Sequence, residues 1–534
     1  MRMRRYVDSQ PLLRVEGLTT EFPGQRAVDG VSFSVARGSI VALVGSSGSG
    51  KTVTALSLLR LVREPGRIVA GRVLYGGRDL LRLGEPELRA VRGGRIATVF
   101  QDPLGALHPS MRIGDQIAEA IRAHLPVGAQ EAAARAVGLL ELTGTPLPGE
   151  RARAFPHQLS SGLRQRATIA MALAAGPEIL IADEPTTSLD AILQRELLEL
   201  FARLRRERGL SMLLITHDLA IAASLADQVL VMDHGQIVER GSPRELLGSP
   251  CHPASARLVA STRLLGTPAP EQRPGPSRLL ELEHLSKRFK GTQRAAVEDV
   301  SLHVDAGETL ALVGESGSGK TTLGRMAMRL LAPSSGAVRF AGADLASLAP
   351  AALRRVRREL QIIFPDPAAA LDPRQRVGAI IGEPLRVHRM VATEEQRMAR
   401  VVELLEQVGL EARHLRRYPH QLSGGQRQRV AIARALATRP RLVIADEPLT
   451  ALDVTTQAEI IELLARLQAS TGMSLLLIAH DLRIVRRLAT RVAVMRAGEI
   501  VEQASAEEIY RNSQHPYTRS LLSAALFSAQ PRSA

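Results

Sequence analysis

The chain has 534 residues, of which 45% are hydrophobic and 23% are charged, and its formal net charge is +15. This balance is typical of a soluble globular protein, and the length exceeds what one hydrophobic core usually supports, so we expect more than one domain. No apolar run approaches the roughly 18 residues that a membrane-spanning helix requires.

The cysteine count and the start of the chain narrow the class further. Cys251 is the only cysteine, so it cannot form an internal disulfide and cannot hold a zinc or iron–sulfur site by itself. The first five residues are basic, but no apolar stretch follows them. We therefore expect no secretory signal and a cytoplasmic location.

The positive charge has three interpretations. Nearly all the basic residues are arginine, so solvated helix faces would account for it, and attraction to the anionic cytoplasmic leaflet is an alternative. Nucleic-acid binding is the third. Aromatic residues make up only 3% of the chain and Trp is absent, which leaves few platforms for stacking bases. We therefore expect no nucleic-acid partner.

The first half begins with two predicted strands, at residues 12–16 and 31–35, followed by an apolar strand over residues 40–44. Fully apolar strands recur at 179–182 and 212–215. Uninterrupted apolar strands are typical of a parallel sheet that is buried on both faces. Residues from about 102 to 158 have helical periodicity and predict a helical insertion.

The second half repeats this order. Its predicted strands lie at residues 279–283, 300–304, 309–313, 442–445 and 475–478, and a helical insertion is predicted from about 366 to 421. The join at 262–278 contains Pro268, Pro270, Pro274, Gly275 and Pro276, which predicts a short, semi-rigid linker. We expect one domain over residues 1–261 and a second over 279–534, both of the α/β class, each with a parallel-sheet core, an antiparallel β subdomain and a helical insertion.

A phosphate-binding sequence follows the third predicted strand of each half. The two copies are Gly45-Ser-Ser-Gly-Ser-Gly-Lys51-Thr52 and Gly314-Glu-Ser-Gly-Ser-Gly-Lys320-Thr321. In such a strand–loop–helix setting, backbone N–H groups converge on phosphate oxygens. The lysine would hold the β- and γ-phosphates, and the threonine would ligate Mg²⁺. The whole chain contains only four lysines, which argues against a chance match at both sites.

Three further motifs recur in the same order. Leu159-Ser-Ser-Gly162 returns as Leu422-Ser-Gly-Gly425, Asp183-Glu184 as Asp446-Glu447, and His217 as His480. The offset is 263 residues for each of these pairs and 269 residues for the two lysines. A whole nucleotide-binding domain has therefore been duplicated and fused.

These motifs suggest the chemistry of ATP hydrolysis. Asp183 and Asp446 end apolar strands, where a carboxylate is costly unless it meets a metal or a hydrogen-bond donor, and Mg²⁺ is the natural partner. Glu184 and Glu447 come directly afterwards and would act as general bases on the attacking water. We interpret His217 and His480, each after another apolar strand, as contacts to the γ-phosphate.

The chain resembles a fused pair of ABC-type ATPase domains over essentially its whole length. The run Leu422-Ser-Gly-Gly-Gln426 matches the signature of that superfamily, and Phe100-Gln101-Asp-Pro resembles its Q-loop. Phe22 and Phe289 resemble the aromatic residue that stacks on adenine, although either could be a core residue.

The resemblance implies ATP and Mg²⁺ as cofactors and assigns the following residues. The ATP ligands of the first copy would be Phe22, Gly45, Ser46, Ser47, Gly48, Ser49, Gly50, Lys51 and Thr52. Those of the second copy would be Phe289, Gly314, Glu315, Ser316, Gly317, Ser318, Gly319, Lys320 and Thr321. The signature ligands would be Ser160, Ser161, Gly162, Ser423, Gly424, Gly425 and Gln426. The Mg²⁺ ligands would be Thr52, Gln101, Asp183, Thr321 and Asp446, and the catalytic residues Glu184, His217, Glu447, His480 and Gln101.

In this superfamily the two domains pair head to tail, so the signature of one domain completes the ATP site of the other. By that resemblance, two departures from the family pattern fall in the site built around Lys320. Pro365 replaces the glutamine of the second Q-loop, and Ser161 replaces the first glycine of the first signature. We therefore expect this site to bind ATP but to hydrolyse it slowly.

Within the superfamily, the chain is most similar to the ATP-binding subunits of dipeptide, oligopeptide, nickel or glutathione importers. The evidence is the Gln101-Asp-Pro…Pro109 pattern, Pro156-His-Gln-Leu-Ser160, and His515-Pro-Tyr-Thr518 near the C-terminus. The resemblance implies peripheral attachment at the cytoplasmic face of the membrane, two permease subunits as partners and, through them, an extracytoplasmic substrate-binding protein. A soluble tandem ATPase acting on ribosomes or nucleic acid and a fused sugar-importer ATPase are the alternatives. The sequence does not select the cargo.

Overall fold

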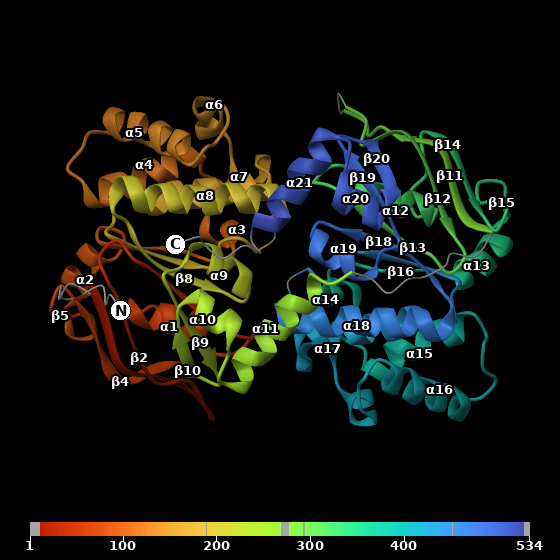
Figure 1. The fold of residues 1–534 in the computed structure, drawn as a ribbon, viewed down its shortest axis with the longest axis horizontal. Coiled ribbons are helices and arrows are strands. Elements are labelled where there is room, and N and C mark those ends of the chain that lie inside the picture. Colours follow the sequence, from red (N-terminus) through yellow and green to blue (C-terminus); the bar gives the residue numbers. More distant parts are fainter. Residues whose placement is uncertain (1–10, 188, 269–276, 292–293, 451, 528–534) are drawn as a thin grey trace. The chain divides into compact units, whose positions relative to one another are not determined.

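The computed structural model describes residues 11–187, 189–268, 277–291, 294–450 and 452–527. These residues form two compact units (Figure 1). Of the described residues, the first unit contains those up to Leu189, Leu193–Thr262 and residues 526–527, and the second contains Asp190–Ile192 and those within Arg263–Ala525. Of the predicted linker, residues 262–265 belong to a helix and 269–276 lie outside the described residues, so the domain boundaries stay a prediction.

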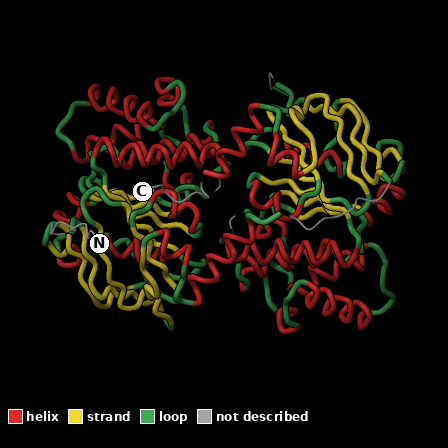
Figure 2. The backbone as a smooth tube through the Cα atoms, in the orientation of Figure 1, coloured by secondary structure: helices red, strands yellow, loops and turns green. Residues whose placement is uncertain are grey.

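Each unit contains a four-stranded antiparallel sheet and a six-stranded sheet, drawn in yellow in Figure 2. The strands of the first unit are β1 (Leu13–Phe22), β2 (Gln25–Val35), β3 (Ile40–Val44), β4 (Arg67–Tyr75), β5 (Arg78–Asp79), β6 (Ile96–Val99), β7 (Ile179–Asp183), β8 (Ser211–Thr216), β9 (Gln228–Asp233) and β10 (Gln236–Gly241). Those of the second are β11 (Arg278–Lys287), β12 (Val297–Asp305), β13 (Thr309–Val313), β14 (Ser335–Phe340), β15 (Ala343–Asp344), β16 (Leu360–Ile363), β17 (Leu442–Asp446), β18 (Ser474–Ala479), β19 (Arg491–Arg496) and β20 (Glu499–Ser505).

The helices cover the sheets and form the insertions. In the first unit they are α1 (Lys51–Leu58), α2 (Glu85–Val91), α3 (Pro103–Ala106), α4 (Ile113–His124), α5 (Ala129–Leu142), α6 (Pro148–Arg153), α7 (Ser161–Ala172), α8 (Ala191–Arg208), α9 (Leu219–Leu225), α10 (Pro243–Gly248) and α11 (Pro253–Leu265). In the second they are α12 (Lys320–Ala327), α13 (Pro350–Glu359), α14 (Pro367–Ala370), α15 (Val377–Val387), α16 (Glu394–Gln407), α17 (Gly424–Leu436), α18 (Val454–Thr471), α19 (Leu482–Leu488), α20 (Ala506–Asn512) and α21 (Pro516–Phe527). The fold class predicted from the sequence is confirmed.

The strand order of each six-stranded sheet places the sequence motifs of that half beside one another. In the first unit the order is β10-β9-β3-β8-β7-β6, and every neighbouring pair is parallel except β9 and β10. The second unit has the equivalent order, β20-β19-β13-β18-β17-β16. Because the carboxyl ends of parallel strands meet at one edge, the segments that follow β3, β8, β7 and β6 are neighbours there.

Both faces of the six-stranded sheet are buried, which explains the apolar runs in the sequence. Along β3, Ile40 and Val44 belong to the core beneath the helices, whereas Val41 and Leu43 belong to the core shared with the antiparallel sheet. This alternation follows from the two-residue period of a strand. The insertion has a core of its own, built on residues such as Ile117 and Ala136, and Figure 1 shows α4, α5 and α6 grouped at one end of the first unit.

The core under α8 offers a stability test. Phe201 is fully buried there, so Phe201→Ala should lower the opening free energy of the first unit by about 3–5 kcal/mol through lost contacts and a residual cavity. Hydrogen exchange of the β3 and β8 amides measures this quantity for that unit. The control Val69→Ala removes a side chain that is 51% exposed and should change it by less than about 0.5 kcal/mol. Equal losses from both variants would contradict the assignment of the core.

Candidate active sites

The phosphate-binding loop of each unit connects the central strand to the following helix and requires glycine at its end. Gly50 caps α1 with φ of 103°, and a Cβ at this position would lie 2.2 Å from the Ala27 carbonyl oxygen. Gly319 caps α12 with φ of 108° and would place a Cβ 2.2 Å from the Ala296 oxygen. Side chains other than hydrogen are excluded at both positions, which leaves the backbone free to turn tightly around a ligand.

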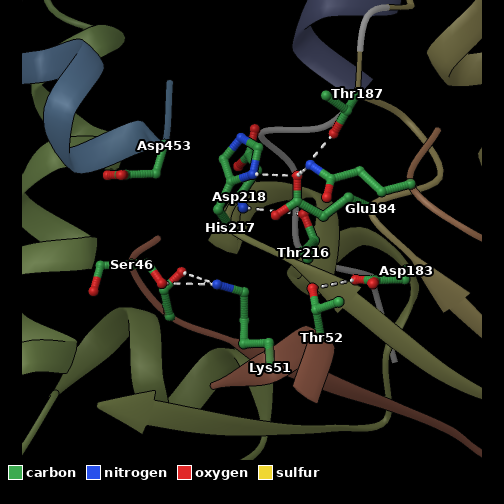
Figure 3. Close-up of polar contacts among 12 residues, drawn as sticks. Ser46, Lys51, Thr52, Asp183, Glu184, Thr187, Thr216, His217, Asp218 and Asp453 are labelled. Carbon is green, nitrogen blue, oxygen red and sulfur yellow. Dashed lines mark hydrogen bonds and ion pairs between the residues drawn. The ribbon is translucent and has the colours of Figure 1, made fainter. Parts of the chain in front are cut away.

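The lysine of each loop is buried and is held by the loop itself. Lys51 Nζ donates to the carbonyl oxygens of Gly45 and Ser46, at 2.9 and 2.8 Å (Figure 3). Lys320 Nζ makes the equivalent bonds to Gly314 and Glu315, also at 2.9 and 2.8 Å. A buried ammonium needs such acceptors. Lys51 and Lys320 are the first residues of α1 and α12, directly after the loops, and their role as phosphate ligands stays a prediction.

The aspartate that ends each adjacent strand meets the threonine that follows the lysine. Thr52 Oγ1 donates to Asp183 at 3.3 Å (Figure 3). In the second unit, Thr321 Oγ1 donates to Asp446 at 3.0 Å. Burial raises the pKa of Asp183 to about 6, and the hydrogen bond from Thr52 only partly offsets it. Burial raises the pKa of Asp446 in the same direction.

A hydroxyl beside a buried carboxylate fits a hard cation. Among the residues that the structure describes, no group of three or more His, Cys, Asp and Glu side chains could hold a metal alone. Mg²⁺ in nucleotide sites takes most of its ligands from phosphates and water and needs only one or two protein groups. The pairs Thr52–Asp183 and Thr321–Asp446 therefore fit a Mg²⁺ ion that arrives with the nucleotide.

The glutamate after each aspartate forms an ion pair with the histidine from the neighbouring strand. His217 Nδ1 lies 3.2 Å from Glu184 Oε2, which also accepts a hydrogen bond from Thr187 Oγ1 at 3.0 Å (Figure 3). In the second unit, His480 Nδ1 lies 3.6 Å from Glu447, and Thr450 Oγ1 donates to Glu447 at 3.2 Å. In each unit the structure thus brings together the glutamate and the histidine that the sequence analysis named as catalytic.

Opposing effects set the pKa values of the first pair. Burial would raise the pKa of Glu184, but the contacts with His217 and Thr187 outweigh it, so the net shift is downward. Burial would lower the pKa of His217, but the Glu184 carboxylate outweighs it and the net shift is upward. Both shifts favour the form in which the Glu184 carboxylate faces a protonated His217.

The backbone at both glutamates is strained. Glu184 has φ of 46° and Glu447 has φ of 45°, in the left-handed region that residues with a Cβ seldom adopt. Their N–H groups donate to Ile215 and Ile478 on the neighbouring strands, at 2.9 Å in each case. Strain of this kind persists only where the surroundings over-determine it, and it concentrates at functional sites.

The Q-loops of the two units differ. Gln101 Nε2 donates to Glu184 Oε2 at 3.2 Å, so the predicted Q-loop residue contacts the predicted general base directly. Pro365 occupies the equivalent position in the second unit and has neither a carboxamide nor a backbone N–H to offer. Glu447, the predicted general base of the second unit, therefore lacks this polar contact.

The signature residues begin long helices, and the two signatures also differ. Ser160 caps α7 by accepting the Leu163 N–H at 3.4 Å, and Ser423 caps α17 by accepting the Gln426 N–H at 3.2 Å. Only Gln426 returns a bond, accepting the Ser423 N–H at 3.1 Å to complete a capping box. Leu163 cannot do so. The sequence motifs did not lead us to expect that Leu163 stands where the second unit has Gln426. An alignment of the two halves at the offset of 263 residues would have revealed it.

The predicted adenine-stacking residues lie on the first strand of the first unit and just beyond that of the second. Phe22 ends β1 and is half-buried, whereas Phe289 is 43% exposed, with Lys287 Nζ 5.6 Å from its ring centroid. Phe289 is therefore not a core residue. Adenine stacking stays a prediction for both.

The comparisons with known proteins agree with this geometry. A family model described as "ABC transporter" matches residues 28–187 and 297–450, and one described as "Oligopeptide/dipeptide transporter, C-terminal region" matches residues 501–533. The chain therefore belongs to the ABC transporter family, and it is an ATPase of that family.

Two curated relatives extend over nearly the whole chain. It is 42% identical over 561 residues to the glutathione import ATP-binding protein GsiA of Escherichia coli O157:H7, covering 97% of this chain and 90% of that protein. It is 44% identical over 532 residues to the peptidoglycan transport ATP-binding protein YejF of Agrobacterium fabrum, covering 97% of each. The resemblance inferred from the motifs is confirmed.

The contact between Glu184 and His217 leads to a testable prediction: removing the Glu184 carboxylate should reverse the direction of the pKa shift of His217. In the unaltered protein the pKa of His217 should lie above its usual value of about 6.5, so its contribution to stability is complete below about pH 6.5 and is lost as the pH rises through the raised pKa. In Glu184→Gln the carboxylate that raises the pKa of His217 is gone, so burial is the largest remaining effect. The pKa of His217 should then fall below about 6.5. Histidine NMR titration measures it, with His217→Gln to assign the signal. An unchanged His217 pKa in Glu184→Gln would contradict the ion pair.

Proposed function

We propose that this chain energises the import of peptides or related small solutes through a membrane ABC transporter. The observation that carries the proposal is a doubled ATPase site on a chain whose C-terminal region matches that of oligopeptide and dipeptide transporters. The relatives support it, since one is named for glutathione import and the other for peptidoglycan transport. Neither name supports the alternative of a soluble ATPase acting on ribosomes or nucleic acid.

The residues of the first unit would perform hydrolysis in defined roles. Lys51 would exchange its two loop carbonyls for the β- and γ-phosphates, and the loop N–H groups would bind the remaining oxygens. Glu184, whose pKa is lowered by the contact with His217, would orient the attacking water and accept its proton. Bound Mg²⁺ would supply neutralisation of phosphate charge beside Thr52 and Asp183. Gln101 would position the carboxylate and sense the γ-phosphate.

We also propose that the two ATP molecules are hydrolysed at unequal rates. Pro365 removes the Q-loop contact to Glu447, and Ser161 and Leu163 alter the first signature. By the head-to-tail pairing of the family, that signature would serve the ATP bound at Lys320, so all three replacements would act on the same ATP.

Matched substitutions of the two general bases test this inequality. Glu184→Gln should reduce the ATPase rate of the assembled transporter by about a hundredfold or more, because it removes the base of the faster site. Glu447→Gln should reduce it by less than about threefold. Steady-state phosphate release measures both. Equal losses would contradict unequal sites.

A groove near Gln101 supports docking of a permease subunit. It has a volume of about 300 Å³, and its mostly apolar lining includes Leu59, Phe100, His124 and Met171. Phe100 is 40% exposed and precedes Gln101 in the chain, so an apolar helix seated in the groove would lie beside the Q-loop. None of the described helices is long and apolar enough to cross a membrane. The groove and the match to the transporter family support the proposal of peripheral attachment at the cytoplasmic face through two permease subunits, which would receive cargo from an extracytoplasmic binding protein.

Membrane attachment through a permease can be tested by sedimentation. The chain should pellet with membranes when its neighbouring permease subunits are co-expressed and should stay in the supernatant without them. Phe100→Glu places a charge in the apolar groove and should reduce the pelleted fraction severalfold, whereas the control Val69→Glu, on an exposed position of β4, should not. Pelleting that does not depend on the permease would instead indicate direct binding to lipid.

A further inference from the structure

The C-terminal helix of the second unit touches the phosphate-binding loop through one hydroxyl group. The backbone N–H of Glu315, the second residue of that loop, donates to Tyr517 Oη at 2.9 Å. Tyr517 is only 7% exposed, and its ring centroid lies 4.9 Å from the Arg496 guanidinium. Burial raises the pKa of Tyr517 to about 12, so the hydroxyl stays neutral at physiological pH.

The peptide group that Tyr517 holds is also the one that holds the lysine. The Gly314 carbonyl oxygen, which belongs to the same peptide group as the Glu315 N–H, accepts a hydrogen bond from Lys320 Nζ at 2.9 Å. The next carbonyl oxygen, that of Glu315, accepts a second one at 2.8 Å. The tyrosine hydroxyl, the Gly314–Glu315 peptide group and Lys320 therefore form one continuous chain of hydrogen bonds. A shift of Tyr517 would therefore rotate the peptide group whose carbonyl oxygen accepts the hydrogen bond from Lys320.

The turn that presents Tyr517 is fixed to the sheet. Glu502 on β20 accepts the N–H groups of Gln514 and His515, at 2.7 and 3.2 Å. His515 Nδ1 in turn accepts the Tyr517 N–H at 3.2 Å and so caps the start of α21. Tyr517 is thus tied to β20 through the backbone of this turn and to the loop that begins at Gly314 through its hydroxyl.

The first unit has the same turn but lacks the hydroxyl. Glu239 accepts the N–H groups of Cys251 and His252, at 2.9 and 2.8 Å, and His252 Nδ1 accepts the N–H of Ala254 at 3.2 Å. Ala254 stands 263 residues before Tyr517, and Asp233 stands at the same offset from Arg496. Asp233 lies 3.7 Å from Arg257 instead of beneath an aromatic ring. In the first unit, Ala254 and Asp233 therefore stand in place of the tyrosine and the arginine.

We propose that Tyr517 is a positioning residue for the nucleotide site of the second unit, and that it stabilises the loop conformation in which Lys320 is ready to receive a triphosphate. This rests on the proposed function of the loop as an ATP site. The first unit does without such support, so the effect of removing it should be confined to one of the two sites.

The hydrogen bond itself can be tested without nucleotide. Tyr517→Phe keeps the ring against Arg496 and removes only the hydroxyl, so amide exchange in residues 314–319 should become about three- to tenfold faster, with residues 45–50 unchanged. The matched control is Tyr510→Phe, because Tyr510 is partly buried in the same C-terminal region beneath Arg486 and donates its hydroxyl to Leu482 rather than to the loop. That variant should leave exchange of both loops unchanged. Unchanged exchange in Tyr517→Phe would overturn the inference.

The consequence for binding can be tested one site at a time. In a Lys51→Ala background, equilibrium dialysis with radiolabelled ATP reports binding by the second unit, and Tyr517→Phe should weaken it about three- to tenfold. In a Lys320→Ala background the same change should alter affinity by less than about twofold. Faster loop exchange without weaker ATP binding would overturn the inference and leave the proposed function standing. Failure of the Lys51→Ala chain to bind ATP at all would overturn the ATP site of the second unit, and the inference with it.

Discussion

Buried charge at the carboxyl edge of the parallel sheet is the constraint on which both units depend. Lys51 and Asp183 are 5% and 3% exposed, and an unpaired ion in such a place is strongly unfavourable. The loop carbonyls satisfy the lysine, Thr52 satisfies the aspartate, and His217 satisfies Glu184. These protein groups thus make the hydrogen bonds and ion pairs that a triphosphate and its cation would otherwise make. Binding of the nucleotide would exchange them for phosphate oxygens and Mg²⁺.

Much of this arrangement could be predicted because strand order follows from simple rules. The bounds of β3 and β13 match the prediction, since a fully apolar run before a glycine loop has few alternatives. Parallel pairing then brings Asp183 and His217 to one edge. The left-handed backbone at Glu184 and the Gln101–Glu184 bond could not be predicted, because they depend on how separate loops pack. Tyr517 was noticed only as part of a family motif, since its contact with Glu315 spans about 200 residues of sequence.

The two units share their chemistry and differ in what supports it. Both retain the lysine, the threonine, the aspartate, the glutamate and the histidine, with closely similar hydrogen bonds. The differences lie around these groups, at Gln101 and Pro365, at Leu163 and Gln426, and at Ala254 and Tyr517. Duplicated domains can diverge in this way because a supporting contact tunes the geometry of a site without removing any reacting group. If Tyr517 steadies the loop as proposed, then together with a Glu447 that lacks a glutamine contact it would favour a site that retains ATP.

Rapid acid quench of the assembled transporter, loaded with two radiolabelled ATP molecules per chain, tests this account most directly. The account predicts two phases, in which about half of the bound ATP is hydrolysed quickly and the other half at least tenfold more slowly. Hydrolysis of all the bound ATP in a single phase would contradict it.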